Sequence, residues 1–150
     1  MRKAFLTAVL VTLPVAALAE DPAEELVEAR QGYYSLLGAN MHNLVSMVKG
    51  ETAYDGAKAQ TAADNMLVLT RYHVGTLYLP GTSSEDVKGS RALPKIWEDP
   101  AGMQEKGMAF VKAVENLNEV AGLDKAELGK AVQNLGGTCK GCHDSYRAKD

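Results

Sequence analysis

The sequence predicts an all-α protein with four helices around one core. Helix-capping residues recur along the 150-residue chain, and between them apolar residues step by three and four positions, as on one face of a helix. No stretch shows the apolar and polar alternation of a strand. These observations favour a four-helix bundle over any fold that contains a sheet.

The first helix is predicted from Asp21 to Gly50. Asp21, Pro22 and Glu24 supply an N-cap, a proline at the first helical position and a capping-box acid, and Lys49-Gly50 marks the end. The residues expected to face the core, which we call the seam of the helix, are spaced alternately four and three positions apart. An arginine and a tyrosine come first in this seam, which consists of Arg30, Tyr34, Leu37, Met41, Leu44 and Val48.

The second helix is predicted to begin at Asp55 and to end before Pro80-Gly81. Its seam is Ala62, Met66, Leu69 and His73. The stretch from Gly81 to Pro94, rich in Ser, Thr and Gly, is predicted to be a long connection. Asp99-Pro100 then repeats the cap-plus-proline signal for a third helix that ends at Gly122.

The fourth helix is predicted to start at Asp124, with Glu127 one turn later. The seam of the third helix is Phe110, Val114, Leu117 and Ala121, and that of the fourth is Leu128, Val132, Leu135, Cys139, Cys142 and Tyr146. The two cysteines are therefore predicted on the face that packs into the core.

Cys139-Lys140-Gly141-Cys142-His143 is a C-x-x-C-H motif and holds the only two cysteines of the chain. This motif is typical of c-type haem attachment. Two thiols add across the two vinyl groups on one edge of the porphyrin, and the adjacent imidazole reaches the iron; on a helix the three side chains share a face. The sequence therefore predicts one covalent haem c inside the bundle.

Other functions of a C-x-x-C pair fit less well. A thioredoxin-like pair lies at the start of a helix after a strand, whereas about fifteen residues of helical pattern precede this one. A zinc site needs a fourth ligand and usually a second cysteine pair. A disulfide has poor geometry at this spacing within a helix and leaves His143 without a role.

The N-terminus has the three parts of a secretory signal peptide: basic Met1-Arg2-Lys3, an apolar run from Ala4 to Leu18, and a small-residue cleavage site at Ala17-Leu18-Ala19. The apolar run is short for a membrane anchor. We therefore predict a signal peptide over residues 1–19, cleaved after Ala19, and one haem-binding domain over residues 20–150. The predicted location is the periplasm, an oxidising compartment in which c-type haem is attached.

Cleavage would leave about 131 residues, enough for one compact domain. It removes two of the 16 basic residues, so that 14 basic residues stand against 19 acidic ones and the formal charge is −5. This sign argues against a nucleic-acid partner.

Arg30 lies within the apolar seam of the first helix, where a cation needs an anionic partner or an exit to water. A haem propionate suits the forked donors of arginine, and a snorkelling side chain at the bundle edge is the alternative. Met41, Met66 and His73 also lie on seams. We expect the methionines to fill the core, and His73 is the stronger of the alternative iron ligands.

Taken together, these features resemble the class II c-type cytochromes, and specifically the cytochrome c′ family. A C-x-x-C-H motif near the C-terminus of a helical bundle carries most of the likeness. Weaker matches cover the rest of the predicted mature chain: Arg30, Val48-Lys49-Gly50, Tyr54-Asp55, Pro80-Gly81-Thr82 and Ile96-Trp97. The resemblance implies an antiparallel up-down-up-down bundle, a topology of which cytochrome c′ is itself a standard example.

The resemblance also implies a homodimer joined through the first two helices. Apolar residues beside the main seam of the first helix agree with this, namely Leu26, Tyr33, Leu36 and Val45.

By position, the resemblance assigns roles to individual residues. His143 would be the proximal iron ligand, the two motif cysteines would form the thioethers, and Arg147 would lie one turn later, close to the His143 imidazole. Arg30 matches the family's propionate-side arginine, and Tyr34 matches the residue that covers the distal face of the iron. In the low-spin branch of class II that position is a ligating methionine. Tyrosine therefore implies a five-coordinate, high-spin iron that admits small diatomic gases.

Two functions stay open. An open iron position under Tyr34 would bind nitric oxide or carbon monoxide, whereas a sixth ligand would make the protein a one-electron carrier with an unidentified redox partner. A peroxidase-like enzyme needs polar acid and base groups over the iron. Tyr34 alone does not supply them, so we expect no catalytic site.

Overall fold

The structure, a computed structural model, describes residues 21–149. It contains α1 (Pro22–Lys49), α2 (Gly56–Thr70), the 3₁₀ turn η1 (Val74–Leu77), α3 (Lys95–Glu98), α4 (Pro100–Val120) and α5 (Lys125–Tyr146). The predicted signal peptide lies outside the described residues. Within them, no helix is both long and apolar enough to cross a membrane.

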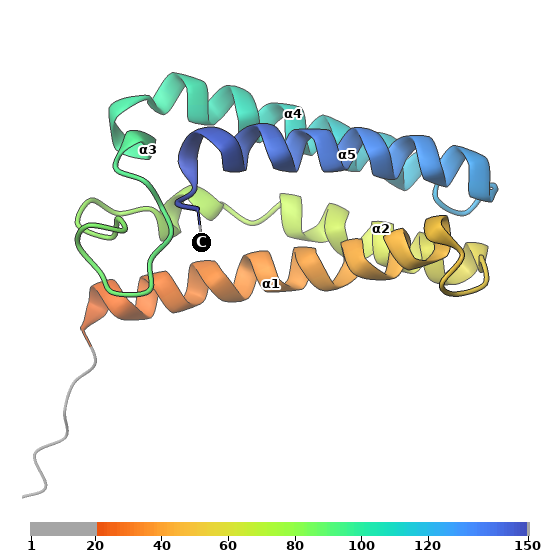
Figure 1. Cartoon of the computed structure of the whole chain (residues 1–150), viewed down its shortest axis with the longest axis horizontal. Helices are drawn as coiled ribbons and strands as arrows, with labels where there is room; N and C mark the ends of the chain where they lie inside the picture. Colours follow the sequence, from red (N-terminus) through yellow and green to blue (C-terminus); the bar gives the residue numbers. More distant parts are fainter. Residues whose placement is uncertain (1–20, 150) are drawn as a thin grey trace, which may run out of the picture.

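The four long helices run antiparallel in chain order, so that α1, α2, α4 and α5 form an up-down-up-down bundle (Figure 1). α1 contacts α2 and α5, and α4 contacts the same two helices, which places the four helices at the corners of a square. Residues 21–149 contain no strand, and one isolated bridge joins Ala92 to Arg147. The predicted fold class is confirmed.

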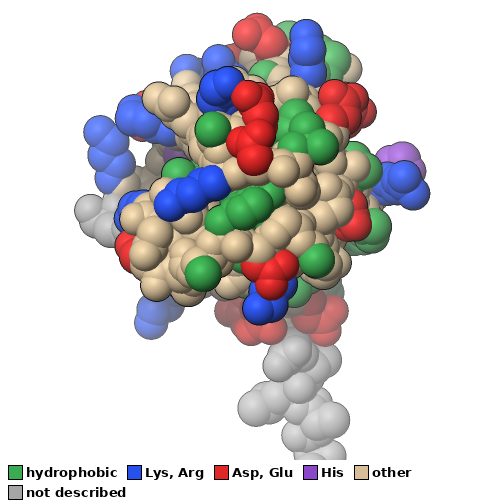
Figure 2. All heavy atoms as spheres, turned by 90° about the vertical axis from the view of Figure 1, so that its right-hand side faces the viewer, with side chains coloured by type: hydrophobic (Ala, Val, Ile, Leu, Met, Phe, Trp, Pro, Cys, Tyr) green, Lys and Arg blue, Asp and Glu red, His purple; other side chains and the backbone are tan. Residues whose placement is uncertain are grey.

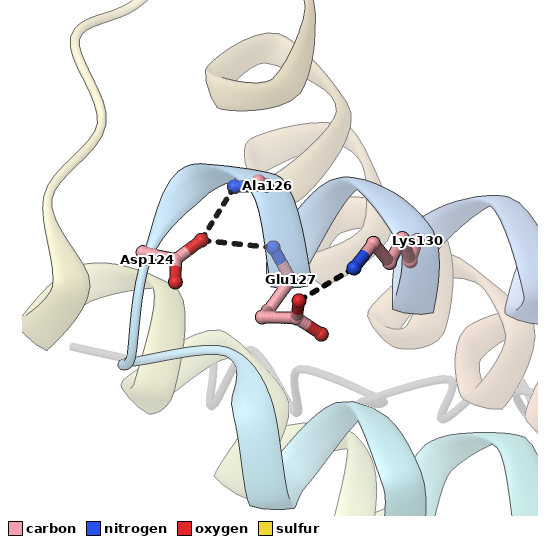
Figure 3. A network of polar contacts seen from close by, with 4 residues as sticks. All are labelled: Asp124, Ala126, Glu127 and Lys130. Atoms are coloured by element: carbon pink, nitrogen blue, oxygen red, sulfur yellow. Dashed lines mark hydrogen bonds and ion pairs between the residues drawn. The ribbon is translucent and has the colours of Figure 1, made fainter.

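Each long helix begins where the sequence predicts it, behind an aspartate whose side chain accepts a main-chain hydrogen bond: Asp21, Asp55, Asp99 and Asp124. At the start of α5, one Asp124 carboxylate oxygen accepts from the N–H groups of Ala126 at 2.8 Å and Glu127 at 2.9 Å (Figure 3). Lys130 pairs with the Glu127 carboxylate at 2.6 Å. These caps satisfy N–H groups that have no partner within the helix.

The second helix is shorter than predicted, because α2 ends at Thr70 rather than just before Pro80. Thr70 Oγ1 donates to the carbonyl of Leu67 at 2.7 Å. The next two N–H groups bond three residues back at 3.1 Å, a tightening typical of a helix C-terminus. His73 therefore lies outside α2, and its predicted place on the helix seam is wrong.

One core runs between the four long helices. Its most deeply buried large side chains confirm the predicted seams at these positions: Leu44, Met66, Val114, Leu117, Leu128 and Leu135. A smaller cluster of Ala92, Ile96 and Tyr146 lies where α3 and the segment before it meet the end of α5. The opposite end, with the α1–α2 and α4–α5 turns, presents charged side chains of both signs among isolated apolar groups (Figure 2).

The apolar surface predicted beside the seam of α1 is smaller than expected. Tyr33 is buried, and Leu26 and Val45 are half-buried against the core. Of the four predicted residues only Leu36 is exposed, at 56%. The reason is that α1 packs against both α2 and α5. Its buried face is therefore wider than the single row of residues predicted to face the core.

Asp99 joins the start of α4 to the end of α5. One carboxylate oxygen accepts from the Tyr146 hydroxyl at 2.7 Å, and the other caps α4 by accepting from the Gly102 N–H at 2.9 Å. These two hydrogen bonds hold the pKa of Asp99 below its usual range, and the first raises the pKa of Tyr146 to about 12. A β-carbon at Gly102 would overlap both the Tyr146 hydroxyl and the Asp99 carboxylate.

We expect Gly102→Ala to destabilise the fold, although alanine is the better helix former. The added methyl group would force Asp99 and Tyr146 apart, at a cost of about 1–3 kcal/mol in the free energy of unfolding. The control is Gly129→Ala in α5, where the methyl group would meet only Val48, at an ordinary 3.8 Å. That change should stabilise the fold by about 1 kcal/mol. Thermal unfolding followed by circular dichroism measures both, and equal shifts would contradict the role of Gly102.

Candidate haem site

A cavity of about 790 Å³ lies between α1, α4 and α5, beside the C-terminal half of α5. Residues from α2, η1, α3 and the segments next to them complete its wall. The wall is largely apolar and includes Leu37, Met66, Ile96, Met103, Phe110 and Val111. The volume is within the range of about 300–1,000 Å³ that is usual for ligand and cofactor sites.

Both motif cysteines line this cavity from α5. Cys139 packs against the main core and Cys142 against the smaller cluster around Ile96, and both are half-buried. Neither thiol is in a disulfide, and burial raises the pKa of both. Two neutral thiols on one helical face therefore border one cavity.

His143 lines the same cavity, one position after Cys142. Partial burial lowers the pKa of His143, and the guanidinium groups of Arg147 and Arg91 lower it further. The neutral imidazole is the form that coordinates a metal. Arg147 Nη1 lies 3.4 Å from His143 Nδ1, so that a cation lies beside this ring.

Arg30 lines the cavity from α1 and is only 5% exposed. Its guanidinium donates to the Thr82 carbonyl at 2.8 Å and to the Ser90 hydroxyl at 3.1 Å. The central carbon of the guanidinium lies 4.6 Å from the centre of the Tyr78 ring. The snorkelling interpretation is therefore wrong, because the long connection supplies the polar partners that a buried arginine needs.

Tyr34 lines the cavity one turn after Arg30. Its hydroxyl accepts a hydrogen bond from the Tyr78 hydroxyl at 3.0 Å, and the Tyr33 ring packs edge-on against its ring with the centroids 5.2 Å apart. The residue is 39% exposed, but desolvation at the cavity wall is the main reason why the pKa of Tyr34 lies above its ordinary value. The phenol is therefore neutral, and the tyrosine that binds haem iron in proteins does so as the anion.

Only two of the three alternative iron ligands line the cavity. Met41 and Met66 line the cavity, whereas His73 does not. His73 is exposed at the start of η1. The prediction that His73 is the stronger alternative ligand is therefore wrong, because the early end of α2 carries it out of the bundle.

Sequence reasoning missed Tyr78, Arg91 and Lys106, which also line the cavity. Tyr78 and Arg91 lie in irregular segments whose path no local pattern specifies. Lys106 lies on α4 outside the predicted seam. The only sequence signal for Tyr78 was its aromatic side chain close to the Pro80-Gly81 turn. The prediction placed Tyr78 inside the second helix, so this signal was not used.

These residues fit a covalently attached haem. Two thiols and a neutral imidazole lie along one face of α5, and the facing walls are apolar. Four cationic residues are among the lining residues, namely Arg30, Arg91, Lys106 and Arg147, and the propionates of a haem need such partners. The donor set of thiols and imidazole is the one that c-type haem requires.

Comparison with known proteins agrees with this fit. The family model described as Cytochrome C′ matches residues 25–147. A curated cytochrome c′ from Cereibacter sphaeroides is 48% identical over 149 residues, which cover 99% of this chain and 99% of the relative.

Solved structures show the same similarity. A cytochrome c′ from Rhodobacter spheriodes has a TM-score of 0.85 at 48% identity and covers 87% of this chain and 100% of that one. A cytochrome c′ described by an unusual ligand-controlled dimer dissociation has a TM-score of 0.78 at 30% identity, with coverages of 87% and 100%. A nitric oxide complex of a variant cytochrome c prime from Alcaligenes xylosoxidans has a TM-score of 0.74 at 30% identity, with coverages of 85% and 97%. The chain therefore belongs to the cytochrome c′ family and is a mono-haem c-type cytochrome with covalently attached haem c.

Proposed function

We propose that this protein is a periplasmic haem protein whose five-coordinate, high-spin iron binds nitric oxide and carbon monoxide and can also exchange electrons. The observation that carries the proposal is the chemistry of Tyr34. This residue lines the cavity as a neutral phenol, in the sequence position where low-spin relatives of the family carry a ligating methionine.

The residues divide the work between the two sides of the haem. Cys139 and Cys142 would hold the group through thioethers, and His143, with Arg147 beside its imidazole, would bind the iron. Arg30 would pair with a propionate while its other donors hold the long connection. When bound, the haem supplies an iron that takes up a diatomic gas and changes between the ferrous and ferric states.

We infer that access to the distal side is narrow. Tyr33 and Tyr78 contact the Tyr34 ring and hydroxyl respectively, so that the phenol cannot turn freely away. Small diatomic molecules pass such a barrier more easily than bulky ligands. The nitric oxide complex of a related cytochrome c prime supports this assignment by similarity.

A low-spin electron carrier is the second candidate. Met41 and Met66 both line the cavity, and a thioether is an established axial ligand of c-type haem. Met66 is almost fully buried within the core and is held there by packing. Met41 is half-buried and is therefore the better candidate for a sixth ligand.

We infer a homodimer joined through α1 and α2. Asn65 of α2 donates to Asn40 of α1 at 3.1 Å, which brings together the parts of the two helices that carry Leu36 and Val68. These two apolar residues are 56% and 62% exposed. The cytochrome c′ with ligand-controlled dimer dissociation supports the inference by similarity.

We also propose that residues 1–19 are removed on export, that residues 20–150 form the mature haem domain, and that the protein has no catalytic site. The described residues that line the cavity include no carboxylate, and their only imidazole is that of His143. A distal general base, which peroxide cleavage would need, is therefore absent from this set.

Cys139→Ala together with Cys142→Ala should abolish covalent attachment and leave little folded protein, because the porphyrin supplies apolar contacts to both clusters and binding is coupled to folding. Acid-acetone extraction and haem staining after denaturing electrophoresis measure attachment, and circular dichroism measures the fold. The control, Lys140→Ala, changes an exposed residue between the two cysteines and should retain the haem. A stable, fully helical, haem-free double variant would contradict the prediction.

Tyr34→Ala should raise the affinity for carbon monoxide by roughly tenfold, or about 1.4 kcal/mol, because it removes the ring that restricts access. The ferric protein should keep a high-spin spectrum, whereas Tyr34→Met should become low-spin. Glu115→Ala, an exposed change on α4 outside both the cavity and the inferred α1–α2 interface, should change neither property. The gas-binding proposal fails when the wild type is already low-spin and does not react with carbon monoxide.

Arg30→Leu should lower the reduction potential of the haem, because loss of a cation next to a propionate favours the ferric state. It should also cost about 1–3 kcal/mol of stability, because the Thr82 carbonyl loses its charged partner. Arg30→Lys should restore only part of the potential and part of the stability, since lysine lacks the paired donors of the guanidinium group. Arg71→Leu, an exposed change at the end of α2, is the control. Voltammetry and thermal unfolding test these outcomes, and an unchanged potential in Arg30→Leu would refute the propionate contact.

A further inference from the structure

Tyr34 and Tyr78 form a phenol pair at the cavity wall. The Tyr78 hydroxyl donates to the Tyr34 hydroxyl at 3.0 Å. Both residues line the cavity, although Tyr34 comes from α1 and Tyr78 follows η1. Nothing in the covalent attachment of the haem requires this pair, so its chemistry is a separate question.

Tyr78 is held from two sides. The Trp97 indole Nε1 donates to the Tyr78 carbonyl at 3.0 Å, and the two rings lie 6.3 Å apart. The Arg30 guanidinium lies over the Tyr78 ring and is itself fixed by Thr82 and Ser90. The Tyr78 hydroxyl is therefore a positioned group and not a mobile one.

The cation next to Tyr78 sets the direction of the hydrogen bond between the phenols. A positive charge makes the nearer phenol the better proton donor, and the Arg30 guanidinium lies 4.6 Å from the centre of the Tyr78 ring. Tyr34 then accepts with its oxygen and keeps its own proton for another acceptor. Within residues 21–149 that proton has no acceptor, and the hydroxyl belongs to a residue that lines the cavity.

We propose that Tyr78 is a positioning residue that fixes the Tyr34 hydroxyl as a hydrogen-bond donor to a diatomic gas held at the iron. The inference rests on the proposed gas-binding function and adds a polar contact to what is otherwise a steric barrier. The Arg30 cation lies over the Tyr78 ring, and the Tyr78 hydroxyl donates to Tyr34, so that the Tyr34 phenol is a stronger donor than an isolated tyrosine. Ligands whose outer atom gains negative charge on binding are favoured by such a donor.

The test compares Tyr78→Phe, Tyr34→Phe and the double variant in the ferrous carbon monoxide complex of the holoprotein. Each single change removes one hydroxyl and keeps the ring. Both should raise the C–O stretching frequency in the infrared spectrum and speed carbon monoxide dissociation by about fivefold. The double variant should add little to either single variant, because the two hydroxyls act as one unit.

Tyr54→Phe is the matched control. Its hydroxyl donates to the Ala121 carbonyl at 3.1 Å, at the end of the bundle remote from the cavity, so the C–O frequency should stay unchanged. A Tyr78→Phe protein with the wild-type frequency overturns the role of Tyr78, even when Tyr34→Phe shifts it. Faster dissociation without a frequency shift means a steric effect only and also overturns the proposal. Failure of the wild type to bind carbon monoxide removes the proposed function itself, and this inference with it.

Discussion

The position of the haem-attachment residues on the buried face of α5 constrains the rest of the bundle. Residues that carry a large planar group cannot also pack closely against α1 and α4, because protein interiors leave little unfilled volume. The helices therefore divide their length between two tasks. Toward one end Leu44, Leu117 and Leu128 fill the core completely. Toward the other, α1 and α4 line the cavity with residues such as Tyr34 and Phe110.

This division explains why the connection between α2 and α4 is long and ordered. Helices that are separated by a cofactor leave the core uncovered at that end of the bundle. An irregular segment can cover this core only when the buried polar groups of the segment form hydrogen bonds. Arg30 meets this requirement for Thr82 and Ser90. Within residues 21–149, no buried side-chain nitrogen or oxygen lacks a hydrogen-bond partner. The segment is thus part of the haem cavity and not a simple link.

Local signals predicted the helix starts, most of the seam positions and the placement of the motif residues on the inner face of α5, because caps, apolar spacing and the C-x-x-C-H motif are each contained within a few turns of chain. The end of α2 and the contacts around Tyr34 and Arg30 were not predictable in this way. Tyr78 bonds to Tyr34 across 44 positions and is held by Trp97 across 19. The burial of Arg30 likewise depends on partners 52 and 60 positions away. Such contacts leave no periodic trace in the sequence.

The dual contacts of Arg30 link the cover of the bundle to the chemistry proposed for the distal side. The same guanidinium that holds the long connection lies over the Tyr78 ring, and Tyr78 bonds to Tyr34. A shift of the connection would move Arg30 and change the field at the phenol pair without any change in the residues nearest the iron. Under the proposed function, residues such as Ser90 would therefore act on the distal side through Arg30, and the ligand properties of the haem would depend on more than Tyr34 alone.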